Sequence, residues 1–172
     1  MNMSKPQPAP AVTVTRGGKY LTFALGAEEY GVQILKVREI ISAMEITPVP
    51  RTPAYVKGVI NLRGQVIPVI DLRAKFAMPA GTRTQATCII VAEIDQNGRR
   101  VNTGLVVDRV SEVLTIAGEQ IEDAPAFDPS VQSNFILGMG KIGRGVKILL
   151  DLDKVLSITD VATLAGLHKD AA

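Results

Sequence analysis

The sequence predicts a mainly β fold, built as two five-stranded barrels packed together, and three observations support this. The 172 residues include no Trp and only 4% aromatic residues, so Val, Ile and Leu must fill the core. β-Branched side chains favour strands. Fifteen Gly and ten Pro supply the turns that many short strands require. The third observation is an internal repeat, which indicates two copies of one small β unit.

The repeat is clearest in residues 58–73 and 138–153, which share a layout of a hairpin followed by a helix. An upstream block, residues 31–41, resembles residues 104–114 with a different offset. We therefore expect a net insertion between the two blocks, in the loop 122–133. Chance similarity between short Gly-Val-Leu strands is the alternative, but two blocks repeated in the same order favour duplication.

The first hairpin is expected to turn at Arg63-Gly64, because two-residue connections that end in Gly are a strong hairpin signal. Val66 is expected in its core, and Asp71 is placed to cap the short helix that follows. The expected strands are 20–25, 30–33, 38–41, 56–62, 65–70, 86–94, 99–107, 110–116, 136–142 and 146–150, with short helices over 72–77 and 152–157 and a helical turn over 34–37.

The chain is expected to divide into an arm, a folded domain and a tail. Residues 1–18 contain several Pro and no apolar segment, so they are predicted to be a disordered arm and not a secretory signal. The folded domain covers residues 19–157, with subdomains of about 19–84 and 85–157. Exchange of strands between the subdomains stays open. Residues 158–172 form a weakly amphipathic C-terminal tail.

Composition argues against several classes of function. The net charge is only +2 and the Lys and Arg are scattered, so the electrostatic pattern of nucleic-acid binding is absent. No apolar run approaches the roughly 20 residues of a membrane span. Cys88, the lone Cys, reads as a small core residue of a cytoplasmic protein. The lone His, His168, lies near the C-terminus, which argues against His-based catalysis or metal binding. We expect no enzyme, no metal and no cofactor.

Two motifs that resemble catalytic sites have simpler interpretations. The segment from Gly138 to Gly143 matches G-x-G-x-x-G, but a strand and not a helix follows, so close packing of hairpin strands is favoured over nucleotide binding. Asp151 and Asp153 are two residues apart on a helix and do not face each other. A helix cap beside a solvated acid is expected there. Glu29, next to Glu28 in a turn, is also expected to be solvated.

Partner recognition remains, and residues where the repeats diverge are the candidates. The Arg63 guanidinium beside Gly64 would form a donor fork for a partner carboxylate or for backbone carbonyls, with a solvated turn residue as the alternative. Alternation along the strand puts Glu39 on one face with Val37 and Ile41. An acid among apolar residues suits the rim of an interface, where charge sets register.

The segment Gly58-Val-Ile-Asn-Leu-Arg-Gly-Gln-Val-Ile-Pro-Val-Ile-Asp-Leu-Arg73 resembles the signature of the CheW family of bacterial chemotaxis coupling proteins. The Asn-Leu-Arg-Gly hairpin is its specific part. Residues 37–39, 104–113 and 148–156 support the resemblance, which runs from about residue 20 to residue 157. It implies two SH3-like five-stranded barrels on a shared apolar core. It also implies a non-enzymatic adaptor in the cytoplasm, at the inner-membrane chemoreceptor array.

The resemblance implies partners as well. The adaptor would join the cytoplasmic helical hairpin of chemoreceptors to the regulatory domain of the histidine kinase CheA. Like-folded domains would assemble into rings, without insertion into the membrane. A CheW-like scaffold for another kinase pathway, such as pilus motility or second-messenger control, is the alternative.

The resemblance also implies site residues. Receptor binding would lie in a groove between the subdomains, as a helix in a groove. Its residues would be Val37, Glu39, Arg63, Gly64 and Val106 or Val107. Kinase contacts are expected near Ile41, Met44 and Val49, although packing in the core is an alternative role for Met44 and Val49.

Overall fold

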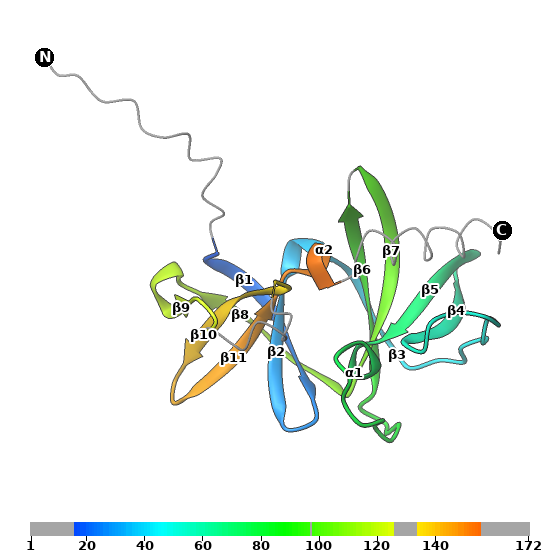
Figure 1. Cartoon of the computed structure of the whole chain (residues 1–172), viewed down its shortest axis with the longest axis horizontal. Coiled ribbons are helices and arrows are strands. Elements are labelled where there is room, and N and C mark those ends of the chain that lie inside the picture. Colours follow the sequence, from blue (N-terminus) through cyan, green and yellow to red (C-terminus); the bar gives the residue numbers. More distant parts are fainter. Residues whose placement is uncertain (1–15, 97, 126–133, 156–172) are drawn as a thin grey trace, which may run out of the picture.

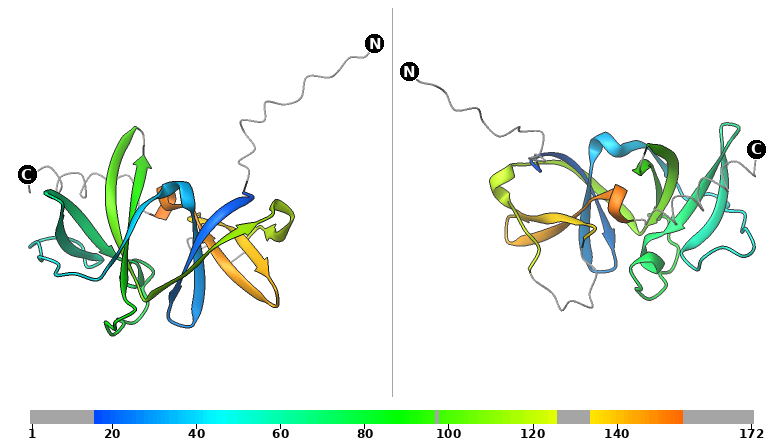
Figure 2. Two further views of the ribbon diagram at one scale, coloured as in Figure 1. Left: turned by 180° about the vertical axis from the view of Figure 1, so that it is seen from behind. Right: turned by 45° about the horizontal axis from the view of Figure 1, so that its top comes forward.

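The fold is mainly β, as predicted. A computed structural model describes residues 16–96, 98–125 and 134–155 and contains two β-sheets and short helices (Figures 1 and 2). The six-stranded sheet has the order β8-β1-β2-β11-β10-β9, and the five-stranded sheet has the order β3-β6-β7-β5-β4. Two sheets agree with the predicted architecture, while the SH3-like barrel assignment stays a prediction.

The expected strands are all present, with small changes at their ends. The six-stranded sheet contains β1 (Gly18–Leu25), β2 (Glu28–Gln33), β8 (Arg109–Ile116), β9 (Ile121–Glu122), β10 (Ile136–Ile142) and β11 (Gly145–Leu150). The five-stranded sheet contains β3 (Val37–Ser42), β4 (Val56–Leu62), β5 (Gln65–Asp71), β6 (Cys88–Gln96) and β7 (Arg99–Val107). The helical segments are η2 (Ile34–Lys36), α1 (Leu72–Lys75), η3 (Gly118–Gln120) and α2 (Leu152–Val155).

The two sheets exchange strands between the sequence repeats. β11 pairs in parallel with β2, where Leu149 lies beside Gly31, and β5 pairs in parallel with β7, where Val69 lies beside Gly104. These four residues occupy matching positions of the two repeats. The boundary expected near residue 84 therefore does not separate the sheets, because β1 and β2 lie in the six-stranded sheet with β8 to β11.

Glycine permits the close strand packing at these positions. A Cβ on Gly31 would lie 2.9 Å from Leu149 Cδ2. A Cβ on Gly138 would lie 2.5 Å from Ile121 Cγ2. Gly138 lies on β10 and Ile121 on β9, so this glycine permits close packing against a neighbouring strand of the sheet and not against β11, the hairpin partner that the sequence interpretation implied.

Local features of the hairpins also repeat. Each hairpin has a register shift near the start of its first strand, after Val56 in β4 and at the matching position of β10. Asp71 Oδ1 accepts a hydrogen bond from Arg73 N at 2.9 Å, and Asp151 Oδ1 accepts one from Asp153 N at 3.1 Å. Both predicted helix caps are therefore confirmed.

Each sheet curls on itself. β8 lies at one edge of the six-stranded sheet, and the chain passes through η3 to β9 at the other edge. In the five-stranded sheet, Thr47 follows edge strand β3 and exchanges two 2.9 Å backbone hydrogen bonds with Val59 on edge strand β4. Curling covers strand edges that would otherwise be open to other chains. It also brings β3 close to the β4–β5 hairpin.

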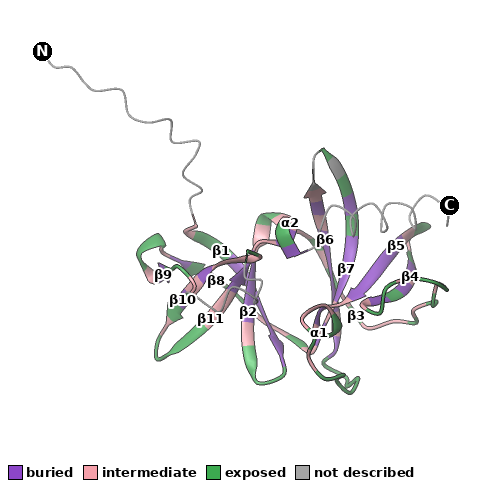
Figure 3. Cartoon of the chain, in the orientation of Figure 1, coloured by how far each residue is buried: buried purple, intermediate pink, exposed green. Residues whose placement is uncertain are grey.

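The apolar core consists of three clusters. The largest contains residues of both sheets, such as Leu21 and Leu150 from one sheet and Ile90 and Leu105 from the other. The second lies in the five-stranded sheet: Ile60, Ile67, Val69, Ile89 and Val91. The third lies in the six-stranded sheet: Tyr20, Ile116, Ile121 and Leu149. Figure 3 shows exposed residues gathered at the hairpin tips.

Several expectations need correction. Val66 was expected in the core of the first hairpin but is only partly buried, and the buried residues of β5 begin at Ile67. α1 ends at Lys75, earlier than expected. β1 begins at Gly18, so the arm reaches the sheet sooner than predicted. Residues 1–15, the end of the expected second helix and the tail 158–172 lie outside the described residues.

Candidate functional site

The β4–β5 turn holds Arg63 in a conformation that few non-glycine residues adopt. Arg63 has a φ of 50° and Gly64 a φ of 84°. Positive φ at both central residues of a two-residue hairpin is the pattern of a type I′ turn. Asn61 Oδ1 accepts a hydrogen bond from Gly64 N at 2.9 Å and so fixes the turn. In the second repeat Gly143, with a φ of 60°, replaces Arg63.

Glu39 lies on β3, an edge strand whose residues alternate between partly buried and exposed. Glu39 and Ile41 share one face, beside Val91 and Ile89 of the core of the five-stranded sheet. A register shift between Val37 and Glu39 turns Val37 toward Ala92 and the shared core, so the alternation expected from the sequence is broken at Val37. The Glu39 side chain is 29% exposed, so its carboxylate lies at the boundary between the sheet and solvent.

Arg63 and Glu39 form a bidentate ion pair. Arg63 Nη1 donates to Glu39 Oε2 at 2.9 Å, and Nη2 donates to Oε1. These charge-assisted hydrogen bonds lower the pKa of Glu39 and raise the pKa of Arg63. A partner carboxylate or backbone carbonyls were expected at the Arg63 fork, but a carboxylate of the same chain occupies it. This correction changes the chemistry expected of a partner.

The ion pair borders a pocket of about 280 Å³ in the five-stranded sheet. Ile67 and Val91 are buried and belong to the core of this sheet, so the pocket has an apolar floor. The lining residues are Arg38, Glu39, Leu62, Arg63, Gln65, Ile67, Val91 and Asn102. All lie on β3 to β7 or the turn between them. The Arg63–Glu39 pair therefore lies within the five-stranded sheet, and the residues that line the pocket come from both sides of the boundary expected near residue 84.

The other residues expected to bind a receptor differ in accessibility. Gly64 is exposed at the hairpin tip, and Val37 is partly buried against the shared core. Val106 is partly buried and packs against the core of the five-stranded sheet. Val107 is only 1% exposed and lies in the shared core, so it offers no surface to a partner.

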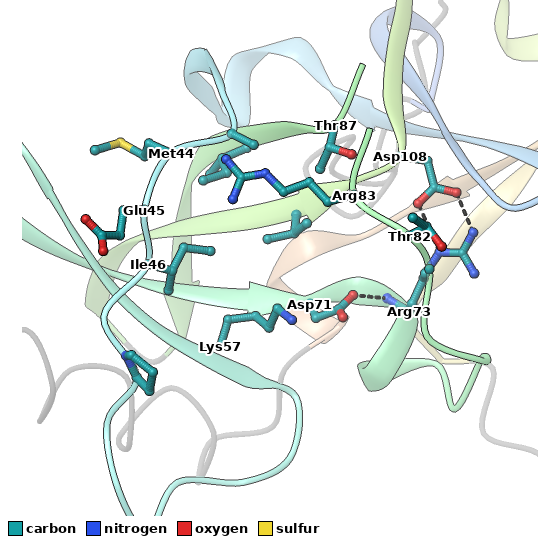
Figure 4. A pocket seen from close by; sticks show the side chains of 15 residues that line it. Met44, Glu45, Ile46, Lys57, Asp71, Arg73, Thr82, Arg83, Thr87 and Asp108 are labelled. Carbon is teal, nitrogen blue, oxygen red and sulfur yellow. Dashed lines mark hydrogen bonds and ion pairs between the residues drawn. The ribbon is translucent and has the colours of Figure 1, made fainter. Parts of the chain in front are cut away.

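The residues expected to bind a kinase lie on β3 and on the segment that leads to β4. Ile41 and Met44 pack against the core of the five-stranded sheet, and Val49 is partly buried further along this segment. Met44 borders a cavity of about 420 Å³ (Figure 4). Apolar residues of its lining include Ile46, Ile89 and Val106, and charged ones include Glu45, Lys57, Asp71, Arg73, Arg83 and Asp108.

Sequence reasoning missed an ion cluster around Glu29, which was expected to be solvated. Glu29 accepts hydrogen bonds from Lys147 Nζ at 2.5 Å, Ser111 Oγ at 3.0 Å and Arg109 Nη2 at 3.2 Å. These bonds, with that of Lys147 contributing most, lower the pKa of Glu29. The cluster joins β2, β8 and β11 within the six-stranded sheet.

The repeat explains where this cluster lies. Lys147 matches Ile67, and Glu29 matches Asn102, and both of these matching residues line the pocket beside Arg63. The six-stranded sheet thus places an ion pair where the five-stranded sheet has an apolar floor and an amide. Aligning the two repeats could have revealed the cluster, because Lys147 and Glu29 are charged where the other repeat has Ile67 and Asn102.

Neither metal binding nor a membrane span finds support in the described part of the chain. Residues 16–96, 98–125 and 134–155 contain no group of three or more His, Cys, Asp or Glu side chains that could hold a metal ion. No helix within the same ranges is long and apolar enough to cross a membrane.

Comparison with known proteins identifies the family. The CheW-like domain matches residues 19–160. The "Chemotaxis protein CheW" of Klebsiella aerogenes is 42% identical over 155 residues, which cover 90% of this chain and 91% of that protein. The chain belongs to the CheW family. The resemblance found in the sequence is therefore confirmed.

Further relatives agree on family and fold. The CheW protein of Rhizobium meliloti is 40% identical over 143 residues, covering 83% of this chain and 90% of that protein. The crystal structure of the scaffolding protein TtCheW from Thermoanaerobacter tengcongensis superposes with a TM-score of 0.73 at 33% identity, covering 84% of this chain and 95% of that one. As a member of the CheW family, the chain is a non-enzymatic scaffold of chemotaxis.

Proposed function

We propose that this CheW-family scaffold couples the cytoplasmic tips of chemoreceptors to the histidine kinase CheA, in the cytoplasm at the inner-membrane receptor array. The observation that carries the proposal is the pocket beside the Arg63–Glu39 pair, with its apolar floor and charged rim. A rim charge that sets register around an apolar contact is typical of a recognition site.

The geometry of the pocket defines the receptor contact. Because Glu39 already occupies the Arg63 fork, a partner carboxylate gains little there. An apolar side chain from a receptor helix fits better, because Ile67 and Val91 form the floor beneath the pair. The ion pair then positions the helix without supplying most of the affinity. This contact is a helix packed against a groove.

The kinase contact uses a different part of the same sheet. The chain runs from Glu39 through Ile41 to Met44, which borders the 420 Å³ cavity, and then to Val49. The regulatory domain of CheA would cover Met44 and the apolar residues near it. Two separate contacts on one rigid sheet allow receptor and kinase to bind at once, and they allow like-folded domains to continue into a ring.

Two titrations by calorimetry test the proposal, one with a receptor-tip helical hairpin fragment and one with the isolated CheA regulatory domain. Arg63→Glu leaves two acids at the rim, so we expect loss of receptor binding and retention of kinase binding. Met44→Glu should have the opposite effect. Arg144→Glu, at the tip of the matching β10–β11 hairpin, is the control and should bind both.

The same titrations can reject the proposal. Unchanged receptor affinity of a folded Arg63→Glu variant would remove the pocket from the receptor site. If the wild type binds the regulatory domain of a pilus or second-messenger kinase but not that of CheA, the alternative pathway holds.

A further inference from the structure

Among the residues that the structure describes, two ion pairs cross the junction between the sheets. Arg73 follows β5 on α1 and donates from Nε to Asp108 Oδ1 at 2.9 Å and from Nη2 to Asp108 Oδ2 at 2.5 Å. Lys36 on η2 donates from Nζ to Asp153 Oδ1 at 2.8 Å and to Oδ2 at 3.0 Å. The exposed fractions are 18% for Arg73 and 22% for Lys36, so both cations are largely shielded from water. Asp153 had been expected to be a solvated acid.

Each acid also accepts a backbone hydrogen bond, and these bonds complete the links between sheets. Asp108 Oδ2 accepts from Gly26 N at 2.7 Å, in the β1–β2 turn of the six-stranded sheet. Arg73 thus connects the end of the five-stranded sheet to the six-stranded sheet through Asp108. Asp153 on α2 follows the six-stranded sheet, and its Oδ1 accepts from Asp95 N on β6 of the five-stranded sheet at 2.8 Å.

The two links occupy related places in the repeats, with the charges reversed. Arg73 and Asp153 are matching residues, each two positions after a capping Asp. Each pairs with a residue of the segment that crosses from one sheet to the other: Asp108 between β7 and β8, and Lys36 between β2 and β3. Both repeats thus have an ion pair at the same place, between the short helix and the crossing segment, but the residues that form it differ. Duplication of one sequence does not by itself explain both ion pairs.

We propose that these two ion pairs fix the angle between the sheets, and that Arg73, Asp108, Lys36 and Asp153 are positioning residues of the scaffold. The shared apolar core holds the sheets together, but burial of apolar surface is non-directional. The bidentate fork of Arg73 on Asp108 imposes direction. At the second link, direction comes from Lys36 Nζ and Asp95 N, which both donate to the Asp153 carboxylate. α1 and α2 lie at opposite ends of the junction (Figures 1 and 2), so the two links resist rotation of one sheet against the other.

Distances between spin labels on the two sheets test this proposal without any partner. In the full chain with Cys88→Ser, labels are attached at Lys19→Cys on β1 and Lys57→Cys on β4, both exposed positions. We expect Asp108→Asn and Asp153→Asn each to broaden the distance distribution, and the double variant to broaden it further. A second label pair within the six-stranded sheet, at Lys19→Cys and Val146→Cys, should keep its width.

Two controls separate positioning from stability. Glu29→Gln weakens an ion cluster inside one sheet, so it should lower the melting temperature and leave the distance between sheets unchanged. Reversing the second pair with Lys36→Asp and Asp153→Lys together should narrow only in part the distribution that each single change broadens, because a lysine side chain at position 153 cannot accept the hydrogen bond from Asp95 N. An unchanged distribution in folded single variants would overturn the proposal.

Discussion

Arg63, at the tip of the β4–β5 hairpin, closes a bidentate ion pair with Glu39 on the opposite edge strand β3. The pair spans the two edges that the curled sheet brings together, and it borders the pocket between them. Arg63 adopts a positive φ to do this, a conformation that disfavours a non-glycine residue by about 1–2 kcal/mol. The guanidinium is thus held at the rim despite a local backbone cost.

Arg63→Gly should weaken receptor-hairpin binding while the free energy of unfolding stays near the wild-type value. Gly accepts the positive φ readily, and this offsets the loss of an ion pair that is largely open to solvent. Calorimetry for binding and chemical denaturation for stability check the two parts. A folded variant that binds the receptor normally would exclude the guanidinium from the site.

Val69→Asp should destabilise the fold by several kcal/mol, about 3 or more, because it buries an unpaired charge. Val69 is fully buried in the core of the five-stranded sheet. Val66 lies three positions earlier on the same strand and is only partly buried, so Val66→Asp should destabilise the fold much less. Urea denaturation of both variants compares them, and equal losses of stability would show that the burial pattern of β5 is wrong.

Gly104→Ala should destabilise by about 1–3 kcal/mol, the usual cost of overpacking a core. The new Cβ would lie 2.8 Å from Ile89 Cγ2 and 3.2 Å from Val69 Cγ2, inside the parallel β5–β7 pairing. Gly118→Ala meets nothing within 4 Å and serves as the matched control. Thermal unfolding distinguishes the two, and a neutral Gly104→Ala would contradict the close approach of the strands.

Acid should weaken the link between the sheets at Asp108. The Arg73 hydrogen bonds, together with the bond from Gly26 N, hold the pKa of Asp108 below its usual value. A carboxyl with a lowered folded pKa contributes stability that is complete above its unfolded pKa, about 3.9, and lost as pH falls through the folded value. The unfolding free energy of Asp108→Asn should therefore fall less steeply than that of the wild type below about pH 4. Parallel curves from denaturation at several pH values would contradict this.

The sequence was sufficient to predict most strands and both helix caps because their signals are local, whereas β9 and η3 were not expected. The Arg63-Gly64 turn and the Asp71 cap each depend on a few adjacent residues. The repeat predicted equivalent hairpins, and the matching antiparallel pairings of β4–β5 and β10–β11 confirm this.

Long-range pairing was not predictable in the same way. The Arg63 fork was assigned to a partner because nothing local shows that β3 returns beside the β4–β5 hairpin. Asp153 was expected to be solvated for the same reason, since Lys36 lies 117 residues away in the sequence. Val106 and Val107 are adjacent in the sequence, and the packing of β7 in the folded sheet determines that Val107 is fully buried and Val106 only partly.

Co-sedimentation of CheA with receptor-bearing membranes tests the central claim most directly, with wild-type protein, Arg63→Gly or no added protein. We expect the wild type to bring the kinase down with the membranes, and Arg63→Gly to bring down less of it while still binding the isolated regulatory domain. Kinase that sediments equally well with Arg63→Gly, or that fails to sediment with the wild type, would contradict coupling through the Arg63–Glu39 pocket.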